Sequence, residues 1–406
     1  MSKLDELIRE YCPDGIEYKK LGVAVSIERG KRLVRDQLSN DCGYPVFQNS
    51  MTPLGYHTDY NYPENTVFII GAGAAGEIGF SSVKFWAADD CYPMVCRADI
   101  SSRYLYHALL RIQPQIKSRV RKASIPRLSR ASIEQLEIPV PPLPVQGEIV
   151  RILDNFTELT AELTAELTAR KKQYEYYRDK LLTCDDNIVV KRIGDITQVF
   201  SASRVHKDEW TTEGVPFYRS SDVISYFNGV ENSRGKAYIS KELYEKLSAK
   251  SGKICKDDIL ITGGGTIGIP YIVPNDDPIY MKDADLLCIQ HSKEFDSRYL
   301  YHYFLSTPFR DYLKGITHDA TIPHYTISQI CETPVPLPSL DVQKRIVNVL
   351  DNFDAICSDL KIGLPAEIEA RQKQYEFYRD ALLTYAATGK TILTDRQTDR
   401  QTDRRV

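Results

Sequence analysis

Residues 102–107 read SRYLYH, and residues 297–302 repeat the same six letters. Two longer stretches follow each copy and match at eight of twelve and nine of eleven positions: VQGEIVRILDNF (145–156) with VQKRIVNVLDNF (342–353), and QYEYYRDKLLT (173–183) with QYEFYRDALLT (374–384). Weaker matches keep the same order, while the offset between partners grows from 171 or 172 to 201 residues. Such collinear matches indicate a duplicated unit that has gained insertions.

The well-matched stretches are predicted to form long helices. Apolar residues at Val145, Ile149 and Ile152 continue toward Leu163 at alternating steps of four and three, the a/d pattern of a coiled-coil seam. The seam residues that we expect are Phe156, Leu159, Leu163 and Leu167 in the first copy, and Phe353 and Leu360 in the second. A seam this narrow favours antiparallel pairing of the two helices; the alternative is that each helix packs only on its own domain.

Two features set the lengths of these helices. The first contains TAELTAEL (160–167), a four-residue repeat that drifts from strict heptads. The second is four residues longer between its Phe and QYE motifs, and Gly363 and Pro365 predict a break that absorbs the difference.

The remaining sequence mixes short apolar runs, Gly and Asn turns and single helices, which predicts two compact α/β (α+β) domains in a pseudo-twofold arrangement. Pro-rich connectors, IPVPPLP (138–144) and TPVPLPSL (333–340), lead into the helices. The predicted boundaries are a first domain at 1–140, a first helical region at 141–185, a second domain at 186–336, a second helical region at 337–390 and a disordered repeat tail at 391–406.

Composition constrains the setting but not the partner. The formal net charge is −3, so a nucleic-acid surface would have to be a local basic face. Nine cysteines are scattered without a C-x-x-C pair, which is typical of free thiols in a reducing cytosol. No apolar run approaches the roughly 18 residues of a membrane span. The sequence therefore predicts a soluble, cytoplasmic protein.

The stretch IIGAGAAGEIGF (69–80) contains G-x-G-x-x-G, as a dinucleotide or S-adenosylmethionine site would. In such folds the third glycine opens a helix, but here the residues after Gly76 alternate and include aromatics. The second copy, LITGGGTIGIPY (260–271), continues into Pro270 and β-branched residues. Both copies therefore favour a strand-to-strand turn, which is either a plain hairpin or a close approach to a neighbouring backbone or to DNA.

No catalytic, cofactor-binding or metal-binding residue is predicted in this chain. Gly389-Lys390-Thr391 ends like a Walker A loop, but Thr384 stands where the first glycine is required. The seven histidines are dispersed, which does not suit a metal site. Motifs of zinc proteases, serine hydrolases and adenine methyltransferases are missing from the sequence.

A basic run without an acid, residues 111–133, is the best candidate for contact with DNA phosphates, although a solvated basic face remains the alternative. Its counterpart, 308–330, is less basic. FQNS (47–50) aligns with YRSS (218–221); Gln and Asn suit adenine edges and Arg suits guanine. The predicted DNA-binding residues are Gln48, Asn49, Lys117, Arg119, Arg121, Lys122, Arg127, Arg219, Ser220, Ser221, His324 and Tyr325.

The expected helix length suits two DNA readers. From Phe156 to Leu182 is about 27 residues, or about 40 Å at 1.5 Å per residue. Half-sites on one face of B-DNA lie roughly 34 to 36 Å apart. The two domains would thus lie about one DNA turn apart.

Taken together, these motifs resemble the specificity (S) subunit of type I restriction-modification systems, closest to the type IC group. The likeness rests on two variable domains, each followed by Q..IV..LD.F and KQYE(Y/F)YRD.LL, on the Pro-rich connectors and on TAELTAEL, and it covers nearly the whole chain. The tail TDRQTDRQTDRRV (394–406) is a departure from the repeated unit.

The resemblance implies that each variable domain is a target recognition domain for one half of a bipartite, asymmetric site in double-stranded DNA. The helices would set the spacer and dock two modification (methyltransferase) subunits, and restriction (translocase/nuclease) subunits would join them. S-adenosylmethionine, ATP and Mg would belong to those partners. The alternative interpretation is a non-DNA coiled-coil scaffold that presents two α/β interaction modules.

Overall fold

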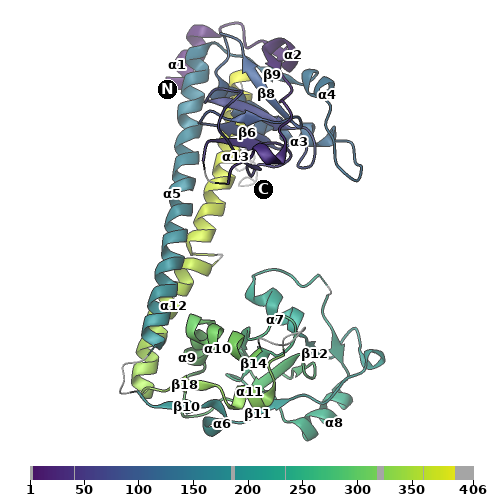
Figure 1. The fold of residues 1–406 in the computed structure, drawn as a ribbon, viewed down its shortest axis with the longest axis vertical. Helices are drawn as coiled ribbons and strands as arrows, with labels where there is room; N and C mark the ends of the chain where they lie inside the picture. Colours follow the sequence, from purple (N-terminus) through teal and green to yellow (C-terminus); the bar gives the residue numbers. More distant parts are fainter. Residues whose placement is uncertain are drawn as a thin grey trace, which may run out of the picture. The chain divides into compact units, whose positions relative to one another are not determined.

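The computed structural model describes residues 3–40, 42–183, 188–233, 235–317, 324–359 and 361–388. The chain divides into two compact units (Figure 1): unit 1 is Met1–Thr164 with Glu367–Val406, and unit 2 is Ala165–Ala366. The division falls inside the TAEL repeat, so each unit combines residues from both halves of the sequence. Leu360, Gly389, Lys390 and the predicted tail lie outside the described residues.

Unit 1 mixes short helices and strands in the alternating order expected of an α/β domain. Its elements are α1 (Lys3–Tyr11), β1 (Tyr18–Lys20), α2 (Leu21–Ala24), β2 (Val25–Ile27), η1 (Arg35–Gln37), β3 (Tyr44–Phe47), β4 (Gly55–His57), β5 (Thr66–Ile70), β6 (Ile78–Ser81), β7 (Trp86–Ala87), β8 (Cys91–Cys96), α3 (Ser102–Ser118), α4 (Arg130–Glu134), β9 (Glu137–Pro139), the first part of α5 (Leu143–Leu182) and nearly all of α13 (Leu364–Thr388).

Unit 2 repeats this order with α7 and α8 added and with two helices, α9 and α10, in place of the single helix α3. Its elements are the rest of α5, β10 (Val190–Arg192), α6 (Ile193–Ile196), β11 (Val199–Ser201), η2 (Lys207–Glu209), β12 (Val215–Tyr218), α7 (Ser220–Phe227), β13 (Tyr238–Ile239), α8 (Lys241–Ser251), β14 (Ile259–Thr262), β15 (Pro270–Ile272), β16 (Tyr280–Met281), β17 (Leu286–Ile289), α9 (Ser297–Leu305), α10 (Thr307–Thr317), α11 (Ile327–Cys331), β18 (Pro334–Pro336) and α12 (Leu340–Ser358).

The sheets show the duplication directly. A four-stranded antiparallel sheet has the order β2-β8-β5-β6 in unit 1 and β11-β17-β14-β15 in unit 2. A three-stranded sheet, β4-β3-β7, corresponds to β13-β12-β16, and its β3–β7 and β12–β16 pairs are both parallel. Matching topology at equivalent positions confirms the predicted pair of α/β domains.

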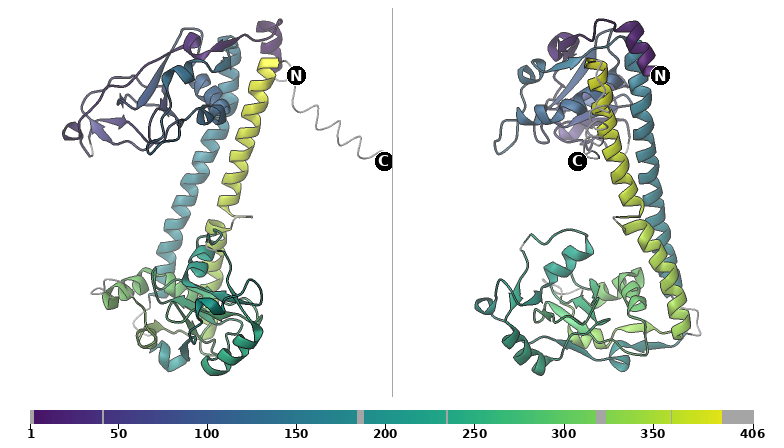
Figure 2. Two further views of the ribbon diagram at one scale, coloured as in Figure 1. Left: turned by 90° about the vertical axis from the view of Figure 1, so that its right-hand side faces the viewer. Right: turned by 180° about the vertical axis from the view of Figure 1, so that it is seen from behind.

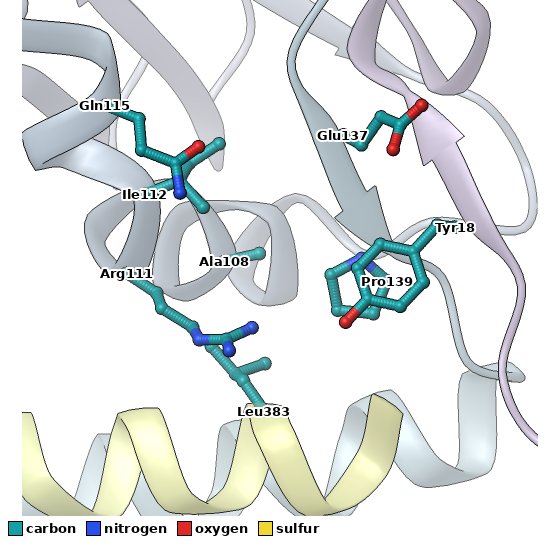
Figure 3. Close-up of a pocket in the computed structure, with 8 residues that line it drawn as sticks. All are labelled: Tyr18, Ala108, Arg111, Ile112, Gln115, Glu137, Pro139 and Leu383. Carbon is teal, nitrogen blue, oxygen red and sulfur yellow. The ribbon is translucent and has the colours of Figure 1, made fainter. Parts of the chain in front are cut away.

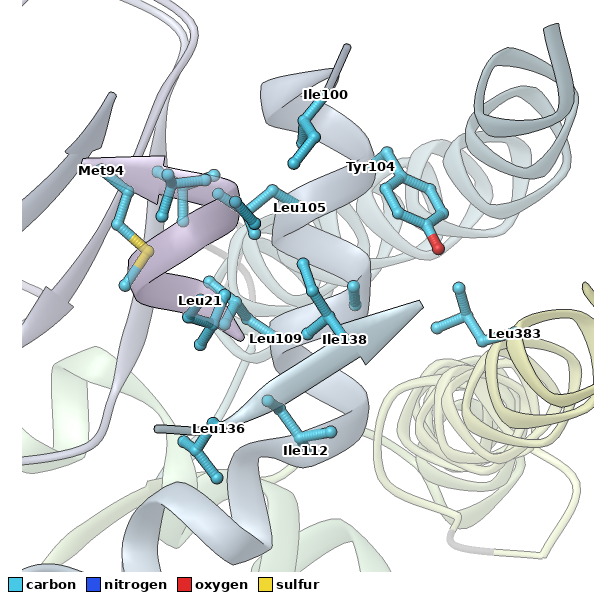
Figure 4. Close-up of a cluster of buried hydrophobic side chains, with 14 of the residues drawn as sticks. Leu21, Met94, Ile100, Tyr104, Leu105, Leu109, Ile112, Leu136, Ile138 and Leu383 are labelled. Carbon is cyan, nitrogen blue, oxygen red and sulfur yellow. The ribbon is translucent and has the colours of Figure 1, made fainter. Parts of the chain in front are cut away.

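The core of unit 1 lies between its larger sheet, α3 and the long helices (Figure 4). Leu105 and Leu109 of α3 are fully buried there together with Met94 of β8. Leu383, from the far end of the chain, is also fully buried in this cluster. Its equivalent Leu182 is buried in the core of unit 2. Burial of one such side chain is worth about 1.5–3 kcal/mol, so each domain is stabilised by the helix that follows the other copy.

Helix α5 is continuous over 40 residues, and its first turns serve the domain rather than a partner helix. Val145, Ile149 and Leu153 are fully buried in the core of unit 1, whereas Ile152, which the a/d pattern predicts as a seam residue, is only half-buried. The seam prediction was therefore wrong for this segment, because the Pro-rich connector brings the start of the helix directly against the domain.

Pairing between helices begins at the predicted phenylalanines. In unit 1 the ring of Phe156 stacks on Tyr378 of α13 with the centroids 5.1 Å apart, and in unit 2 Phe353 of α12 stacks on Tyr177 of α5 at 5.7 Å. Within each unit the two helices run side by side and antiparallel (Figures 1 and 2). Each helix thus packs on a domain at some turns and on the other helix at others. Both alternatives derived from the sequence, packing on the domain and antiparallel helix pairing, therefore hold, at different turns.

The expected break in the second arm is present. Helix α12 ends at Ser358 and α13 begins at Leu364. A Cβ on Gly363 would lie 2.7 Å from the carbonyl oxygens of Ala355 and Asp359, so only glycine fits at this return of the backbone. Pro365 then falls in the first turn of α13, where its missing N–H costs nothing.

The repeated SRYLYH motif supplies a buried histidine that joins each domain to its helices. In unit 1, His107 is fully buried; its Nε2 lies 2.9 Å from Asp154 Oδ1 and its Nδ1 lies 2.8 Å from the hydroxyl of Tyr375. Burial lowers the pKa of His107 to about 4, so the ring is neutral near pH 7. A carboxylate can only accept, so Nε2–H donates to Asp154 and Nδ1 accepts from Tyr375.

Unit 2 contains the same arrangement with the partner motifs exchanged. His302 Nε2 lies 2.7 Å from Asp351 Oδ1, and its Nδ1 lies 3.0 Å from the hydroxyl of Tyr174. Asp351 belongs to the LDNF motif of its own copy, but Tyr174 belongs to the QYE motif of the first copy. The reverse holds for Tyr375 in unit 1. The residues of the repeated motifs therefore form two reciprocal joints, each made of a histidine, an aspartate and a tyrosine.

A second repeated contact fixes the start of each helix. Gln146 is fully buried; its Oε1 accepts from the N–H of Ser101 at 2.8 Å, and its Nε2 donates to the carbonyl of Pro141 at 2.7 Å. Gln343 makes the equivalent bonds to the N–H of Asp296 and the carbonyl of Pro338, both at 2.9 Å. One glutamine thus ties the domain, the connector and the helix together in each unit.

The joints predict matched effects of two substitutions. Tyr375→Phe and Tyr174→Phe each leave a buried imidazole nitrogen without a donor, which should lower the free energy of unfolding by about 1–3 kcal/mol. Hydrogen exchange should show that Y375F loosens unit 1 and Y174F loosens unit 2. Loosening of the unit that retains its tyrosine would contradict the reciprocal arrangement.

Candidate nucleic-acid interface

The glycine-rich stretch is a turn between two antiparallel strands. In unit 1 it joins β5 to β6, whose register pairs Ile69 with Ile78. Gly73 and Gly76 have φ values of +79° and +87°, which L side chains rarely adopt. No helix begins after Gly76, so the phosphate-binding geometry of a dinucleotide fold is not formed. The predicted hairpin is confirmed.

This turn brings the two predicted DNA-binding segments of unit 1 together. On one side, the N–H of Ala74 donates to the carbonyl of Asn49 at 2.9 Å. On the other, the N–H of Gly73 donates to the carbonyl of Pro126 at 3.1 Å, and Ala72 forms an isolated β-bridge with Arg127. Residues far apart in sequence thus form one continuous surface around the turn.

Five basic residues of the run at 111–133 were predicted to bind DNA, and they differ in whether their side chains already have a partner in the protein. Lys117 is paired with Glu77 at 2.9 Å, and Arg119 donates to the carbonyl of Ser132 at 2.7 Å. The other three, Arg121, Lys122 and Arg127, are exposed, and their side chains make no hydrogen bond or ion pair within the described ranges. These three carry the charge that the surface presents to solvent.

The predicted base-reading residues of unit 1 border the same turn. Gln48 is half-buried, and its Nε2 lies 3.4 Å from Asp89 Oδ1. The side chain of Asn49 is exposed, while its backbone holds the turn. A Cβ on Gly73 would come within 2.7 Å of the Asn49 carbonyl oxygen, so the loop and the turn approach as closely as a glycine permits.

Sequence reasoning missed a second basic segment next to this surface. Arg29, Lys31, Arg32 and Arg35 follow β2 and are exposed. The Nε of Arg29 donates to the carbonyl of Asp89 at 3.0 Å, and Asp89 also contacts Gln48. Four cations within ERGKRLVR (28–35) were the available signal, but only tertiary contacts place this segment beside residues 48–50.

Unit 2 builds the same frame from different side chains. Gly265 and Gly268 have φ values of +75° and +76°. The N–H of Gly263 donates to the carbonyl of Asp285 at 2.8 Å, as that of Gly71 does to Asp90 at 2.7 Å in unit 1. Gly264 forms a bridge with His324, the position equivalent to Arg127, and His324 is exposed. The predicted role of His324 thus remains compatible with its position.

Three other predicted residues of unit 2 are not presented to a ligand. Arg219 is only 8% exposed and binds Asp222 with two bonds of 2.8 and 3.0 Å. Burial alone would raise the pKa of Asp222, but the bonds from Arg219 and Asn232 hold it below its usual value. Ser220 is buried and donates to the carbonyl of Asp285 at 2.8 Å. Ser221, half-buried, accepts from Asn232 at 3.1 Å.

Tyr325 was predicted to bind DNA, but the structure does not place its side chain on the surface. Its side chain is 1% exposed, lies in the main core of unit 2 and shares a hydrogen bond with Thr333. The chain turns this residue inward directly after His324, because alternate residues of an extended segment face opposite sides. Arg219 and Tyr325 therefore support the domain, and base contact by their side chains would require rearrangement.

The described residues were also searched for metal sites and for membrane-spanning helices. Among them, no group of three or more His, Cys, Asp and Glu side chains is arranged to hold a metal ion. Within the same residues, no helix combines the length and apolarity needed to cross a membrane.

Comparison with known proteins identifies the family. The model of the type I restriction modification DNA specificity domain matches residues 13–170 and 185–370. The chain belongs to this family. The two matched segments correspond to the two copies of the internal repeat, so the resemblance inferred from the repeated motifs is confirmed, and membership does not favour the non-DNA scaffold. The type IC subgroup stays a prediction.

Relatives of similar length support this assignment. A putative type I restriction enzyme specificity subunit of Haemophilus influenzae is 32% identical over 388 residues, covering 91% of this chain and 96% of the relative. The EcoR124I/EcoR124II specificity subunit of Escherichia coli is 30% identical over 276 residues, covering 64% of this chain and 65% of the relative. The chain is thus a specificity subunit, the non-catalytic member of a type I restriction-modification complex.

Solved structures show the same fold at low identity. A type I S subunit from M. genitalium has a TM-score of 0.53 at 17% identity, covering 93% of this chain and 98% of that one. A chain from a study of type I restriction-modification assembly has a TM-score of 0.61 at 13% identity, covering 91% and 98%. The domain and helix architecture is therefore shared by chains of very different sequence.

The two glycine turns predict unequal effects of the same substitution. Gly73→Ala places a Cβ against the Asn49 carbonyl oxygen, whereas Gly265→Ala meets no atom of the described residues within 4 Å. Both should cost about 1–2 kcal/mol for the left-handed backbone, and only G73A should cost more through the clash. Chemical denaturation of both variants tests this prediction. Equal losses of unfolding free energy would mean that the 48–50 loop can move away from the added methyl group without cost.

Proposed function

We propose that unit 1 and unit 2 each read one half of a bipartite, asymmetric site in double-stranded DNA. The observation that carries this proposal is the same glycine turn at equivalent places in both units with different side chains around it. Asn49 and Arg127 flank the turn of unit 1, and His324 flanks that of unit 2. One frame with two sets of donors and acceptors suits two different base sequences.

Unit 1 is the stronger candidate for binding phosphates. Its surface combines Arg29, Lys31, Arg32 and Arg35 with the three unpaired cations Arg121, Lys122 and Arg127. The corresponding surface of unit 2 has Arg204, His206 and Lys207, and there Lys282 is neutralised by Asp285 at 2.5 Å. Phosphate contacts make binding salt-dependent, so unit 1 should dominate the salt dependence of the whole chain.

Replacement of one flanking residue should alter one half-site only. In a complex assembled with its modification subunits, Arg127→Ala should change the half-site read by unit 1, and His324→Ala should change the other. Methylome sequencing of cells that carry each variant reads both halves at once. If R127A weakened recognition of both halves equally, Arg127 would be a general phosphate contact, and the slope of binding against salt should then fall by about 0.9.

We also propose that the helices set the gap between half-sites and dock two modification subunits. Support comes from α5, which contributes to both units, and from exposed apolar side chains on the helices, such as Tyr176 of α5 at 60% and Ile356 of α12 at 42% exposure. Restriction subunits would join this assembly in the cytoplasm. S-adenosylmethionine, ATP and Mg would be held by those partners.

The number of TAEL units should tune the accepted gap. Deletion of Thr164–Leu167 removes about 6 Å of helical rise, or one to two base-pair steps. The side chains of this segment are half-buried or exposed rather than part of either core, so both domains should still fold. Methylome sequencing should show a shorter gap between unchanged half-sites, and altered half-sites with an unchanged gap would contradict the proposal.

A further inference from the structure

Unit 2 contains a cavity of about 360 Å³ that the recognition surface does not use. It lies where α5 and α12 meet α9, α10 and the end of α7. Aromatic rings and charged groups share its lining. The residues that matter below are Tyr174, Arg178, Phe227, Tyr301, Arg310 and Asp354.

The unusual member of this lining is Arg310. It is half-buried, and its single hydrogen bond within the described residues runs from Nη1 to the carbonyl of Ile267 at 3.3 Å. No carboxylate of that part of the chain forms an ion pair with it. The pKa of Arg310 is lowered, first by burial and then by the neighbouring charge of Arg178. An arginine does not lose its proton in proteins, so Arg310 stays charged without an ion pair among the described residues.

Of the acids near the cavity, Asp179 and Asp354 contact other residues, and Glu175, an exposed residue of the lining, forms no ion pair with Arg310. Asp179 pairs with Arg178 at 3.0 Å and also accepts from the N–H of Thr307. Asp354 lies 3.8 Å from Arg298 and accepts from Ser358 at 3.0 Å. A partly buried charge without a counter-ion is costly, and an anion from outside would offset that cost.

Unit 1 makes the corresponding contact with an uncharged side chain. Gln113 of α3 contacts the glycine turn of unit 1 as Arg310 contacts that of unit 2; its Nε2 donates to the carbonyl of Gly76 at 3.2 Å and to Glu77 at 3.1 Å. The nearest comparable cavity in unit 1, of about 270 Å³, contains Arg111, but Arg111 donates to Thr384 at 2.9 Å and Glu137 lines the same space (Figure 3). Within the described residues Arg111, like Arg310, forms no ion pair, but the cavity of unit 2 differs in that a second arginine, Arg178, lines it beside Arg310.

We propose that the cavity of unit 2 binds a phosphate oxyanion through Arg310 and Arg178. Guanidinium groups match the oxygens of phosphate in geometry and charge, and the rings of Tyr301 and Phe227 line the remaining space. The phosphate belongs either to the backbone of duplex DNA or to a free phosphate compound such as a nucleotide. The site does not depend on the proposed division of the DNA target.

A ligand in this cavity would lie between the glycine turn and the long helices of unit 2. Arg310 contacts the glycine turn through Ile267, and Phe227 ends the helix that follows Arg219. Across the cavity, Tyr174 belongs to the joint with His302. A bound phosphate would thus bridge the recognition turn and the helices.

The test compares the full-length chain with Arg310→Gln, which imitates Gln113 of unit 1, and with Lys314→Gln as a matched control. Lys314 lies on the same helix, α10, is exposed and does not line the cavity. Binding of inorganic phosphate is measured by calorimetry, with chloride at equal ionic strength as the reference. Loss of one charge-assisted bond should weaken binding by about tenfold or more in R310Q, while K314Q should bind as the wild type does.

Competition then identifies the source of the phosphate. Displacement of inorganic phosphate by a short duplex, but not by a nucleoside monophosphate, would assign the site to the DNA backbone; the reverse would assign it to a free nucleotide. The proposal is overturned if the wild type binds no phosphate beyond the chloride reference, if R310Q binds as well as the wild type, or if K314Q loses as much as R310Q. Arg310→Lys keeps the charge and should bind between the wild type and R310Q.

Discussion

The hydrogen bonds of one buried imidazole organise each half of this molecule. His107 and His302 have no exposed surface, so both ring nitrogens need a partner inside the protein. An aspartate from LDNF and a tyrosine hydroxyl from QYE meet that need. Asp154 also accepts from Arg103, and Asp351 from Arg298. Four residue types at fixed spacings therefore recur because each requires the others to be in place.

The exchange of tyrosines has consequences for the whole chain. Each joint takes its histidine and aspartate from one copy of the repeat and its tyrosine from the other. Leu182 and Leu383 follow the same rule, and both are almost fully buried in the domain of the opposite copy. A unit is therefore complete only when both halves of the sequence have folded. This interdependence explains why the division into compact units falls within α5 and not between the copies of the repeat.

The proposed recognition surfaces show how a shared frame acquires different chemistry. In both units a glycine turn is held by backbone hydrogen bonds, which do not depend on the side chains of the loops that supply them. Side chains beside the turn are free to differ, as Arg127 and His324 do. The frame is thus compatible with many sequences, and family membership at 28–32% identity over most of the chain accords with that tolerance.

Much of this architecture was predictable from the sequence. The internal repeat determined the two domains, the two helical regions and the break at Gly363, because motif order and apolar spacing are local properties of the chain. The turn character of the glycine motif followed from the strand-like residues after Gly76 and Gly268. The family followed from the paired motifs.

Only the tertiary structure decided which side chains face outward and which partners meet. Arg219 and Tyr325 looked like DNA-reading residues, yet an ion pair with Asp222 and burial beside Thr333 withdraw them from the surface. The segment at Arg29–Arg35 joins the proposed recognition surface through Asp89, a contact without a sequence signal. The exchange of Tyr174 and Tyr375 was equally hidden, because identical motifs fit either copy. Spacing along a chain specifies local conformation, whereas burial and pairing depend on long-range contacts that form only when the chain closes on itself.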